Sequence, residues 1–218
     1  MRNWIGLSCL IDYKIYMDAI EDLISDFKNL RSLEGEIRNS AISLVNCFRS
    51  GGKLLLCGNG GSCADCEHIA GELVKKFAIE RPLSEEIIEK LGPELSRELH
   101  GGLPALSLPS MIGFHTAFNN DDNTEFAFAQ QVVAFGKPNN ILWGITTSGN
   151  SSNVVYAAKA ARSLGLGTIA LTGSSGGAIA KIADSVIQAP AKDVAKVQEL
   201  HLPIYHAICK FVENEMFS

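Results

Sequence analysis

The sequence lacks a surplus of basic residues and lacks any long apolar run. Its 19 lysines and arginines are outnumbered by 24 aspartates and glutamates, which gives a formal net charge of −5. Proteins that bind nucleic acid generally present a basic patch, so this balance argues against general nucleic-acid binding. No apolar stretch approaches the ~20 residues that a membrane-spanning helix needs. With 218 residues, 46% of them hydrophobic, the chain is suited to one domain with a full core.

The amino terminus lacks the small-x-small pattern of a signal-peptide cleavage site. A short apolar run from Trp4 to Ile11 follows a single arginine and is itself followed by Asp12 and Lys14. We therefore interpret the start as part of the mature chain, or as a start codon assigned too early, before Met17.

The cysteines lack the framework of a secreted disulfide protein. All six lie inside apolar patterns, which predicts reduced thiols and a cytoplasmic protein. Cys63 and Cys66 form one C-x-x-C pair, and no second pair exists to complete a four-cysteine zinc site. Two interpretations of this pair stay open: small residues that pack a helix, or a redox-active or metal-binding site.

Residues 53–77 predict a buried strand, a glycine turn and a helix. The turn, GNGG at residues 58–61, can continue neither a strand nor a helix, and Ser62 is a good N-cap for the helix that follows. Backbone N–H groups, the hydroxyl and the helix dipole all favour an anion such as phosphate there. His68 and Glu72 are four residues apart and share one face of that helix. We therefore expect a phosphate cradle with an imidazole and a carboxylate on the same helix.

Strands alternate with helices along the chain, which predicts an α/β fold. Amphipathic spacing indicates two helices, at residues 17–30 and 33–48, that form an N-terminal helical hairpin within residues 1–52. Strands are expected at residues 53–57, 103–108, 141–146, 167–172 and 185–189, and further helices at 109–121, 124–133, 153–163 and 194–216. The expected architecture is a five-stranded parallel sheet flanked by helices, a flavodoxin-like three-layer sandwich in a single domain over residues 1–218.

Two other segments bear on function. Residues 146–152 (TTSGNSS) follow the third expected strand and open a helix, so they form a second hydroxyl-rich cradle for an anion or sugar. Both cradles should meet at the carboxyl edge of the sheet, where parallel sheets bind ligands. Residues 79–102 carry a charged helical segment that begins at Ser84 and is polar on most faces, so we expect a surface insertion.

Four motifs occur together in this chain: GNGGS at residues 58–62, the helix with His68 and Glu72, TTSGNS at 146–151, and Q-E-x-H-x-x-x-x-H at 198–206. Over about residues 17–218 the chain resembles the sugar isomerase (SIS) fold and, more narrowly, the phosphoheptose (sedoheptulose 7-phosphate) isomerases. The resemblance implies interconversion of a ketose phosphate and an aldose phosphate through an enediol, as a source of heptose for surface polysaccharide. It also implies a homotetramer with interfacial active sites, and zinc in several members.

The resemblance also implies roles for individual residues. Glu72 and His206 would be the general acid/base pair. The zinc ligands would be His68, Glu72, Gln198 and His206. The substrate would be held by Asn59, Gly60, Gly61, Ser62, Thr146, Thr147, Ser148, Ser151 and Gln198.

The residue chemistry agrees with these roles. An aldose–ketose shift moves one proton between two carbons and another between two oxygens, which a carboxylate and an imidazole can perform; Zn²⁺ could instead polarise the carbonyl. Gln198 is a weak zinc ligand, and it lies about 12 Å along a helix from His206, so the two must lean together to share an ion. His201 is expected to be structural, and His115 to face the site.

Some features depart from the family pattern. Residues 109–113 read PSMIG, so Met111 stands where the family has an acidic residue that is thought to touch substrate. Cys63 and Cys66 replace alanines, and the insertion at residues 79–102 is longer than the family's segment. The isomerase chemistry is therefore better supported than the identity of the sugar.

Competing functions stay open at this level. One is a phosphosugar isomerase that acts on sedoheptulose 7-phosphate or on a different ketose phosphate. Another is a non-catalytic SIS module that binds a phosphosugar or a protein, similar to the DnaA initiator-associating proteins. Those proteins lack the full His/Glu/His set, so the retention of His68, Glu72 and His206 favours the enzyme. A redox protein built on Cys63 and Cys66 is a third possibility.

Overall fold

The structure is a computed structural model that describes residues 18–218. The predictions about Trp4–Ile11, Cys9 and a start at Met17 fall outside the described residues. Within residues 18–218, no helix is long and apolar enough to cross a membrane.

Strands and helices alternate as the sequence predicts. The strands are β1 Leu54–Gly58, β2 Ala105–Ser107, β3 Ile141–Thr146, β4 Gly167–Gly173 and β5 Ser185–Ala189. The α-helices are α1 Ala19–Asp26, α2 Glu34–Arg49, α3 Gly61–Val74, α4 Glu85–Glu98, α5 Ile112–Asp121, α6 Ala127–Phe135, α7 Ser152–Ser163 and α8 Val194–Phe217. The 3₁₀ turns are η1 Lys28–Leu33, η2 Leu108–Ser110, η3 Thr124–Phe126 and η4 Ile179–Lys181.

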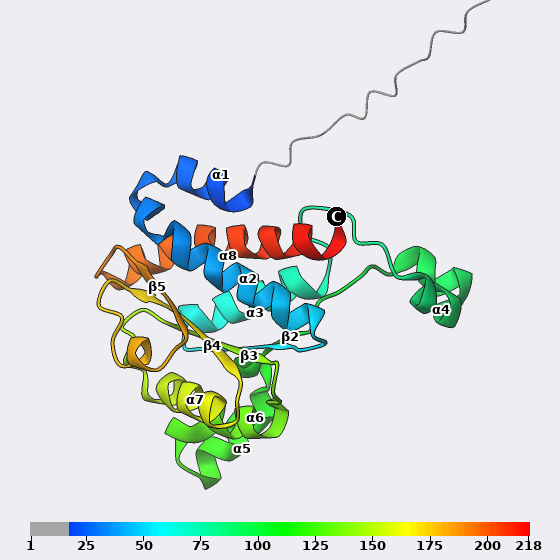
Figure 1. The fold of residues 1–218 in the computed structure, drawn as a ribbon. Helices are drawn as coiled ribbons and strands as arrows, with labels where there is room; N and C mark the ends of the chain where they lie inside the picture. Colours follow the sequence, from blue (N-terminus) through cyan, green and yellow to red (C-terminus); the bar gives the residue numbers. More distant parts are fainter. Residues whose placement is uncertain (1–17) are drawn as a thin grey trace, which may run out of the picture.

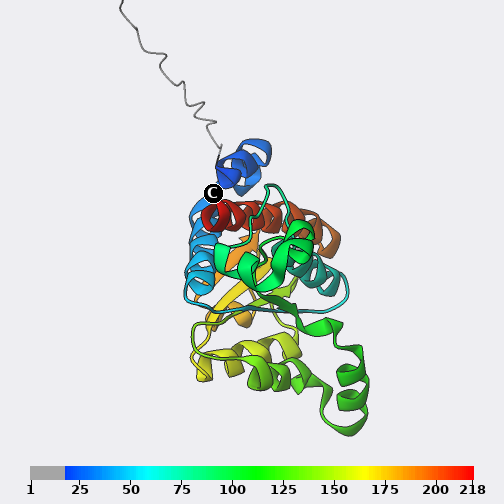
Figure 2. The ribbon, with the colours of Figure 1, turned by 90° about the vertical axis from the view of Figure 1, so that its right-hand side faces the viewer.

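All five strands form one parallel sheet in the order β2-β1-β3-β4-β5. This is the flavodoxin-like order, and it confirms the expected fold class. Figures 1 and 2 show α2, α3 and α8 on one face of the sheet and α6 and α7 on the other. The order reverses beside β1, so the loops after β1 and β3 flank the switch point where such sheets bind ligands.

Alternate residues of each strand enter separate cores on the two faces of the sheet. In β1, Leu54 and Leu56 pack toward α2, α3 and α8, while Leu55 and Cys57 pack toward α6 and α7. All four side chains have no exposed area. A strand that is buried on both faces must be apolar throughout, which explains why β1 reads as an uninterrupted apolar run.

The first helix is shorter than the predicted span of residues 17–30. α1 begins after Asp18, whose carboxylate accepts a hydrogen bond from Ile20 N, and it ends before Phe27. Phe27 has non-helical backbone angles, and the chain then forms η1 before α2. The sequence predicts the break between the two helices at residues 31–32, whereas in the structure it begins at Phe27 and extends over η1.

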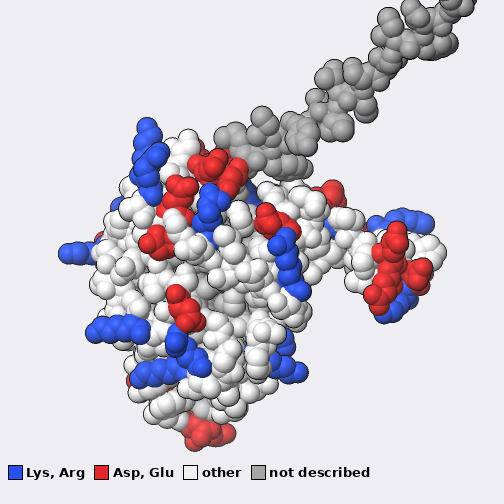
Figure 3. All heavy atoms as spheres, viewed as in Figure 1, with Lys and Arg blue, Asp and Glu red and all other residues white. Residues whose placement is uncertain are grey.

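The insertion forms an exposed arm, as expected. α4 begins at its N-cap Ser84, is kinked at Gly92 before Pro93, and contains no buried residue. Figure 1 shows the arm standing away from the body, and Figure 3 shows acidic and basic side chains intermingled on it. A hydrogen bond of 2.9 Å from Gly101 N to Arg81 O closes the base of the arm.

Candidate active site

The turn after β1 delivers the backbone to α3 as predicted, but its cap differs. Gly60, with φ of 56°, is the N-cap residue, and α3 begins at Gly61. Ser62 therefore lies inside the first turn, is 3% exposed and makes no capping hydrogen bond, so its prediction as the N-cap was wrong. The glycine takes the left-handed conformation that the turn requires, which places the helix start earlier than a serine-based rule does.

Gly61 leaves room for the α8 side chain Gln198. A Cβ on Gly61 would collide with the Gln198 amide. The N–H groups of Gly60 and Gly61 make no backbone hydrogen bond to another described residue. Free N–H groups at a helix start can bind an anion. The structure thus joins Gln198 to the cradle.

The loop after β3 is held by its own hydroxyls and amides. The hydroxyls of Thr146 and Ser151 are 3.0 Å apart, and Thr146 is buried. Asn150 N donates to Ser148 Oγ over 3.1 Å. Gly149, with φ of 69°, lies so close to Gly176 that a side chain would not fit. Gly173 N donates to Thr147 O over 3.0 Å and Ser175 Oγ donates to Ser148 O over 3.4 Å, so this part of the loop lies against the loop after β4. Ser151 lines the same cavity as Asn59 and Gly60.

A reciprocal amide pair links the two cradles. Asn59 Nδ2 donates to Asn153 Oδ1 over 2.9 Å, and Asn153 Nδ2 donates to Asn59 Oδ1 over 2.9 Å. Asn153 was not among the predicted site residues. Two asparagines at the starts of helices after neighbouring parallel strands were the only sequence signal for this contact.

The two cradles share one cavity of about 610 Å³, whose other wall comes from α5, η3 and α6. Its polar lining from the two loops consists of Asn59, Gly60, Ser151, Ser152 and Asn153. His115 also lines it, as predicted, and its Nε2 is 3.1 Å from Leu108 O. Gly61, Ser62, Thr146, Thr147, Ser148 and Gln198 are not part of this lining.

His68, Glu72 and His206 come together within one chain, on the face where α3 packs beside α8. His68 Nε2 is 3.3 Å from Glu72 Oε1 and 3.3 Å from His206 Nε2. The Glu72 side chain is 13% exposed, and Lys75 Nζ donates to its Oε2 over 2.9 Å. Burial, followed by the charge of His68, lowers the pKa of His206, which favours the neutral imidazole.

The four predicted zinc ligands meet only in part. Nitrogens 3.3 Å apart have the separation of two ligands on a tetrahedral ion with bonds of about 2.0–2.1 Å. However, no ion pair joins Glu72 to His206, and no group of three or more His, Cys, Asp or Glu side chains in residues 18–218 is arranged to hold a metal ion. Gln198 lies at Gly61, about 10 Å along α3 from His68. The two imidazoles thus fit zinc, while the four predicted ligands do not converge as they stand.

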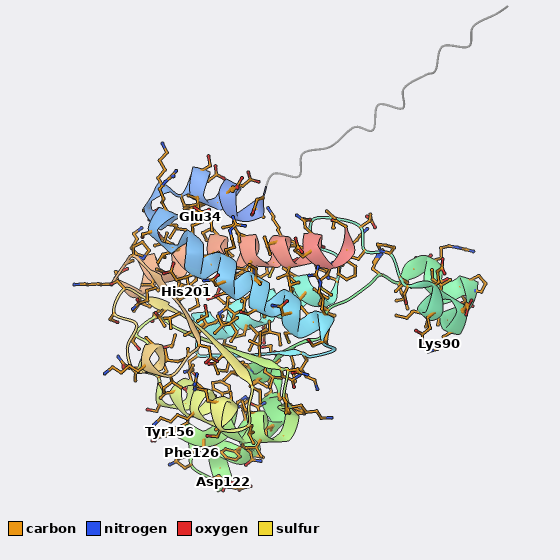
Figure 4. The ribbon with its side chains drawn as sticks, viewed as in Figure 1. Glu34, Lys90, Asp122, Phe126, Tyr156 and His201 are labelled. Atoms are coloured by element: carbon orange, nitrogen blue, oxygen red, sulfur yellow. The ribbon has the colours of Figure 1, made fainter. Side chains whose placement is uncertain are left out.

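His201 belongs to the core. It has no exposed area, its Nε2 is 3.3 Å from Thr172 O, and burial lowers its pKa to about 4. Figure 4 shows it on α8, turned toward the sheet. This placement agrees with the structural role expected from the sequence.

The C-x-x-C pair lies in the first half of α3, and both thiols are free. Cys66 is buried, whereas Cys63 is partly exposed and lines the cavity. Burial raises the pKa of both thiols. A raised pKa lowers the thiolate fraction that redox and metal chemistry need, so the packing interpretation is favoured.

A buried ion pair that the sequence analysis missed holds the end of α3. Arg81 Nε donates to Glu213 Oε1 over 2.7 Å, and neither side chain is exposed. Arg81 also donates to the carbonyl oxygens of Leu73 and Glu72 over 2.6 and 2.7 Å. The pair thereby ties the turn that carries Glu72 to α8, which carries His206.

The fold, the two cradles and the cluster of His68, Glu72 and His206 place the chain in the class of α/β proteins with an SIS domain. The family model described as SIS domain matches residues 15–173. Similarity extends further within that class. The chain is 41% identical over 175 residues to a phosphoheptose isomerase from Roseiflexus, covering 80% of this chain and 79% of that protein.

Two further matches cover more of the molecule. A phosphoheptose isomerase from Akkermansia muciniphila is 34% identical over 201 residues, covering 92% of this chain and 96% of that protein. The structure of phosphoheptose isomerase GmhA from Neisseria gonorrhoeae superposes with a TM-score of 0.73 at 31% identity, covering 89% of this chain and 94% of that one. The protein therefore belongs to the phosphoheptose isomerase family of SIS-domain enzymes.

Proposed function

We propose that the protein interconverts sedoheptulose 7-phosphate and an aldoheptose 7-phosphate. One observation carries this proposal: His206 of α8 contacts His68, which lies beside Glu72 on α3. The helix α3 also begins at the anion cradle. Membership in the phosphoheptose isomerase family supplies the reaction class, an aldose–ketose isomerisation. The retained carboxylate and imidazoles favour an enzyme over a non-catalytic phosphosugar-binding or protein-binding SIS module.

The two parts of the site are far apart within one chain. Gly61 and Glu72 are eleven positions apart on α3, which corresponds to about 16 Å of helix rise. This rise exceeds the length of an extended heptose phosphate, so the cradle and the acid/base cluster of one chain would serve different substrate molecules. The separation therefore supports a proposed active site that is completed between subunits, while Met111 changes the expected hydroxyl contacts.

Glu72 and His206 are proposed to move the two protons of the isomerisation. One group removes the proton from the carbon next to the carbonyl and returns it to the neighbouring carbon, while the other moves a proton between the two oxygens. Atoms and charge balance, because each proton that leaves the substrate returns to it. Lys75, bonded to one oxygen of Glu72, keeps the other oxygen directed toward His68.

Zinc is proposed as a cofactor, held first by His68 and His206. Glu72 would join them after a side-chain movement, and Gln198 would join only if it left Gly61. Bound zinc would supply Lewis-acid polarisation of the substrate carbonyl. Support comes from the 3.3 Å separation of the two imidazole nitrogens.

A homotetramer in the cytoplasm is proposed from the family resemblance and from the free thiols. Cys47, Cys57, Cys63, Cys66 and Cys209 are all unpaired by disulfides, as expected in a reducing compartment. The position of His68 and His206 on the surface of one chain is compatible with an active site completed at a subunit interface.

The direct test is a panel of ketose phosphates of five, six and seven carbons, each assayed with and without added Zn²⁺. We expect turnover of sedoheptulose 7-phosphate with at least a tenfold preference in kcat/KM over the shorter sugars. Preference for a shorter ketose would replace the substrate assignment. No turnover of any member, with metal supplied, would support the binding-module alternative.

A further inference from the structure

We propose that Tyr205 and Asp65 are positioning residues that fix the tautomer of His68, with the proton on Nδ1 and the lone pair of Nε2 directed at Glu72 and His206. The inference concerns the acid/base cluster and rests on the proposed function: the tautomer of His68 affects catalysis through the proposed roles of Glu72 and His206. Neither residue was a predicted site residue, and neither belongs to the acid/base pair or to the proposed zinc ligands.

The contacts of Tyr205 carry the argument. Its hydroxyl oxygen is 3.0 Å from His68 Nδ1 and 3.3 Å from Asp65 Oδ1. The tyrosine lies on α8 and is 1% exposed, so its ring is fixed by the surrounding hydrophobic core. The imidazole meets this ring edge-on, with centroids 5.5 Å apart and planes at 73°. The hydroxyl therefore has two protein partners and a fixed position.

The single hydroxyl proton decides the direction of these bonds. Asp65 Oδ1 accepts it, so the Tyr205 oxygen is left to accept a proton from His68 Nδ1. The other oxygen of Asp65, Oδ2, is buried and has no hydrogen-bond partner among the described residues. Burying a carboxyl group costs desolvation free energy, and the hydrogen bond from Tyr205 explains why one is buried here.

The consequence appears at the opposite nitrogen of the ring. His68 Nε2 then presents a lone pair, 3.3 Å from Glu72 Oε1 and 3.3 Å from His206 Nε2. His206 can donate its Nε2 proton to this lone pair. Because Glu72 Oε1 also faces His68 Nε2, a proton or a cation between the two atoms would be stabilised. Histidines that bind metals usually donate their second N–H in this way, and loss of the acceptor costs 10–100-fold in metal affinity or activity.

The test is the variant Tyr205→Phe, which keeps the ring and removes the hydroxyl. Long-range ¹H–¹⁵N NMR of the metal-free, histidine-labelled protein at about pH 8, above the ordinary imidazole pKa of about 6.5, reports the tautomer directly. Loss of one signal in His68→Gln assigns His68. We expect the Nδ1–H form in the wild type and a mixture, or the Nε2–H form, in Tyr205→Phe. Affinity for Zn²⁺ alone should fall 10–100-fold in the same variant.

Tyr156→Phe is the matched control, because Tyr156 lies on α7 against Phe126, on the other side of the sheet (Figure 4). It should leave both the His68 spectrum and the zinc affinity unchanged. Should Tyr205→Phe fail to fold, Asp65→Asn replaces it: its amide can donate to Tyr205 and so turn the hydroxyl proton toward His68, raising the Nε2–H fraction.

A wild-type His68 protonated on Nε2 would overturn the proposal, as would a His68 tautomer that neither Tyr205→Phe nor Asp65→Asn alters. The spectrum needs no turnover. A protein that shows the expected tautomers but converts no ketose phosphate would therefore contradict the proposed function and leave this inference standing.

Discussion

Glu72 and His206 are the residues on which the proposed chemistry depends. Glu72→Gln and His206→Asn should each lower kcat for isomerisation by about 10²–10⁴-fold, because each removes a group that transfers a proton in the reaction. Steady-state kinetics on sedoheptulose 7-phosphate measures the loss. Circular dichroism should show both variants folded, since neither side chain belongs to the core.

The matched control for these variants is His100→Asn, which changes an exposed imidazole at the base of the arm. It should retain full activity. Full activity in Glu72→Gln or in His206→Asn would remove that residue from the acid/base assignment.

His201 makes stability depend on pH. Burial lowers its pKa from 6.5 to about 4 in the folded state, so between these values the unfolded chain binds a proton that the folded chain does not. Stability therefore falls as the pH drops through this window, by roughly 3 kcal/mol for this group. Urea unfolding at a series of pH values measures it.

The variant His201→Gln isolates this contribution, because all other titrating groups remain. It should be less stable than the wild type at pH 7, and its free energy of unfolding should decline less steeply between pH 6.5 and 4. Parallel pH profiles for the two proteins would show that the pKa of His201 in the folded state is not lowered.

At the scale of elements, α3 and α8 run side by side in the same direction. Their contacts advance together along both helices: Gln198 with Gly61, Tyr205 with Asp65 and His68, His206 with His68, and Glu213 with Phe77 and Ala78. The cradle and the acid/base cluster thus lie at successive levels of one helix pair. The pair is closed at its far end by Arg81 and Glu213.

The variant Arg81→Met should lower the free energy of unfolding by about 3–5 kcal/mol, because it leaves the buried carboxylate of Glu213 without its charge partner. Urea denaturation measures the change. The exposed pair of Lys90 and Glu86 on the arm provides the control, since both side chains are more than two-thirds exposed. Lys90→Met should change stability by less than about 1 kcal/mol. Equal effects of the two substitutions would contradict the role given to the buried pair.

At the scale of the whole molecule, the chain is expected to assemble. Light scattering coupled to gel filtration should give four times the chain mass of 23.4 kDa. The partly exposed His68 side chain and the arm without buried residues both leave surfaces on which other subunits could pack. A monomer with full isomerase activity would show that one chain forms the complete site.

Much of the fold followed from the sequence alone. Strands β3 and β5 begin and end at the predicted residues, and the parallel sheet follows from the alternation of strands and helices. The turn at residues 58–61, the loop at 146–151 and the exposed arm were also predictable. These features depend on local properties: apolar periodicity, glycine and hydroxyl chemistry, and composition.

The tertiary structure decided what depends on the register between helices. Only the packing of α8 against α3 places Tyr205 between Asp65 and His68, brings His206 to His68, and holds Gln198 at the cradle instead of beside the imidazoles. Arg81 and Glu213 are 132 positions apart, and no local pattern pairs them. Sequence spacing fixes which residues share a face of one helix, whereas the level at which two helices meet is set by the whole core, and that level determines the candidate site.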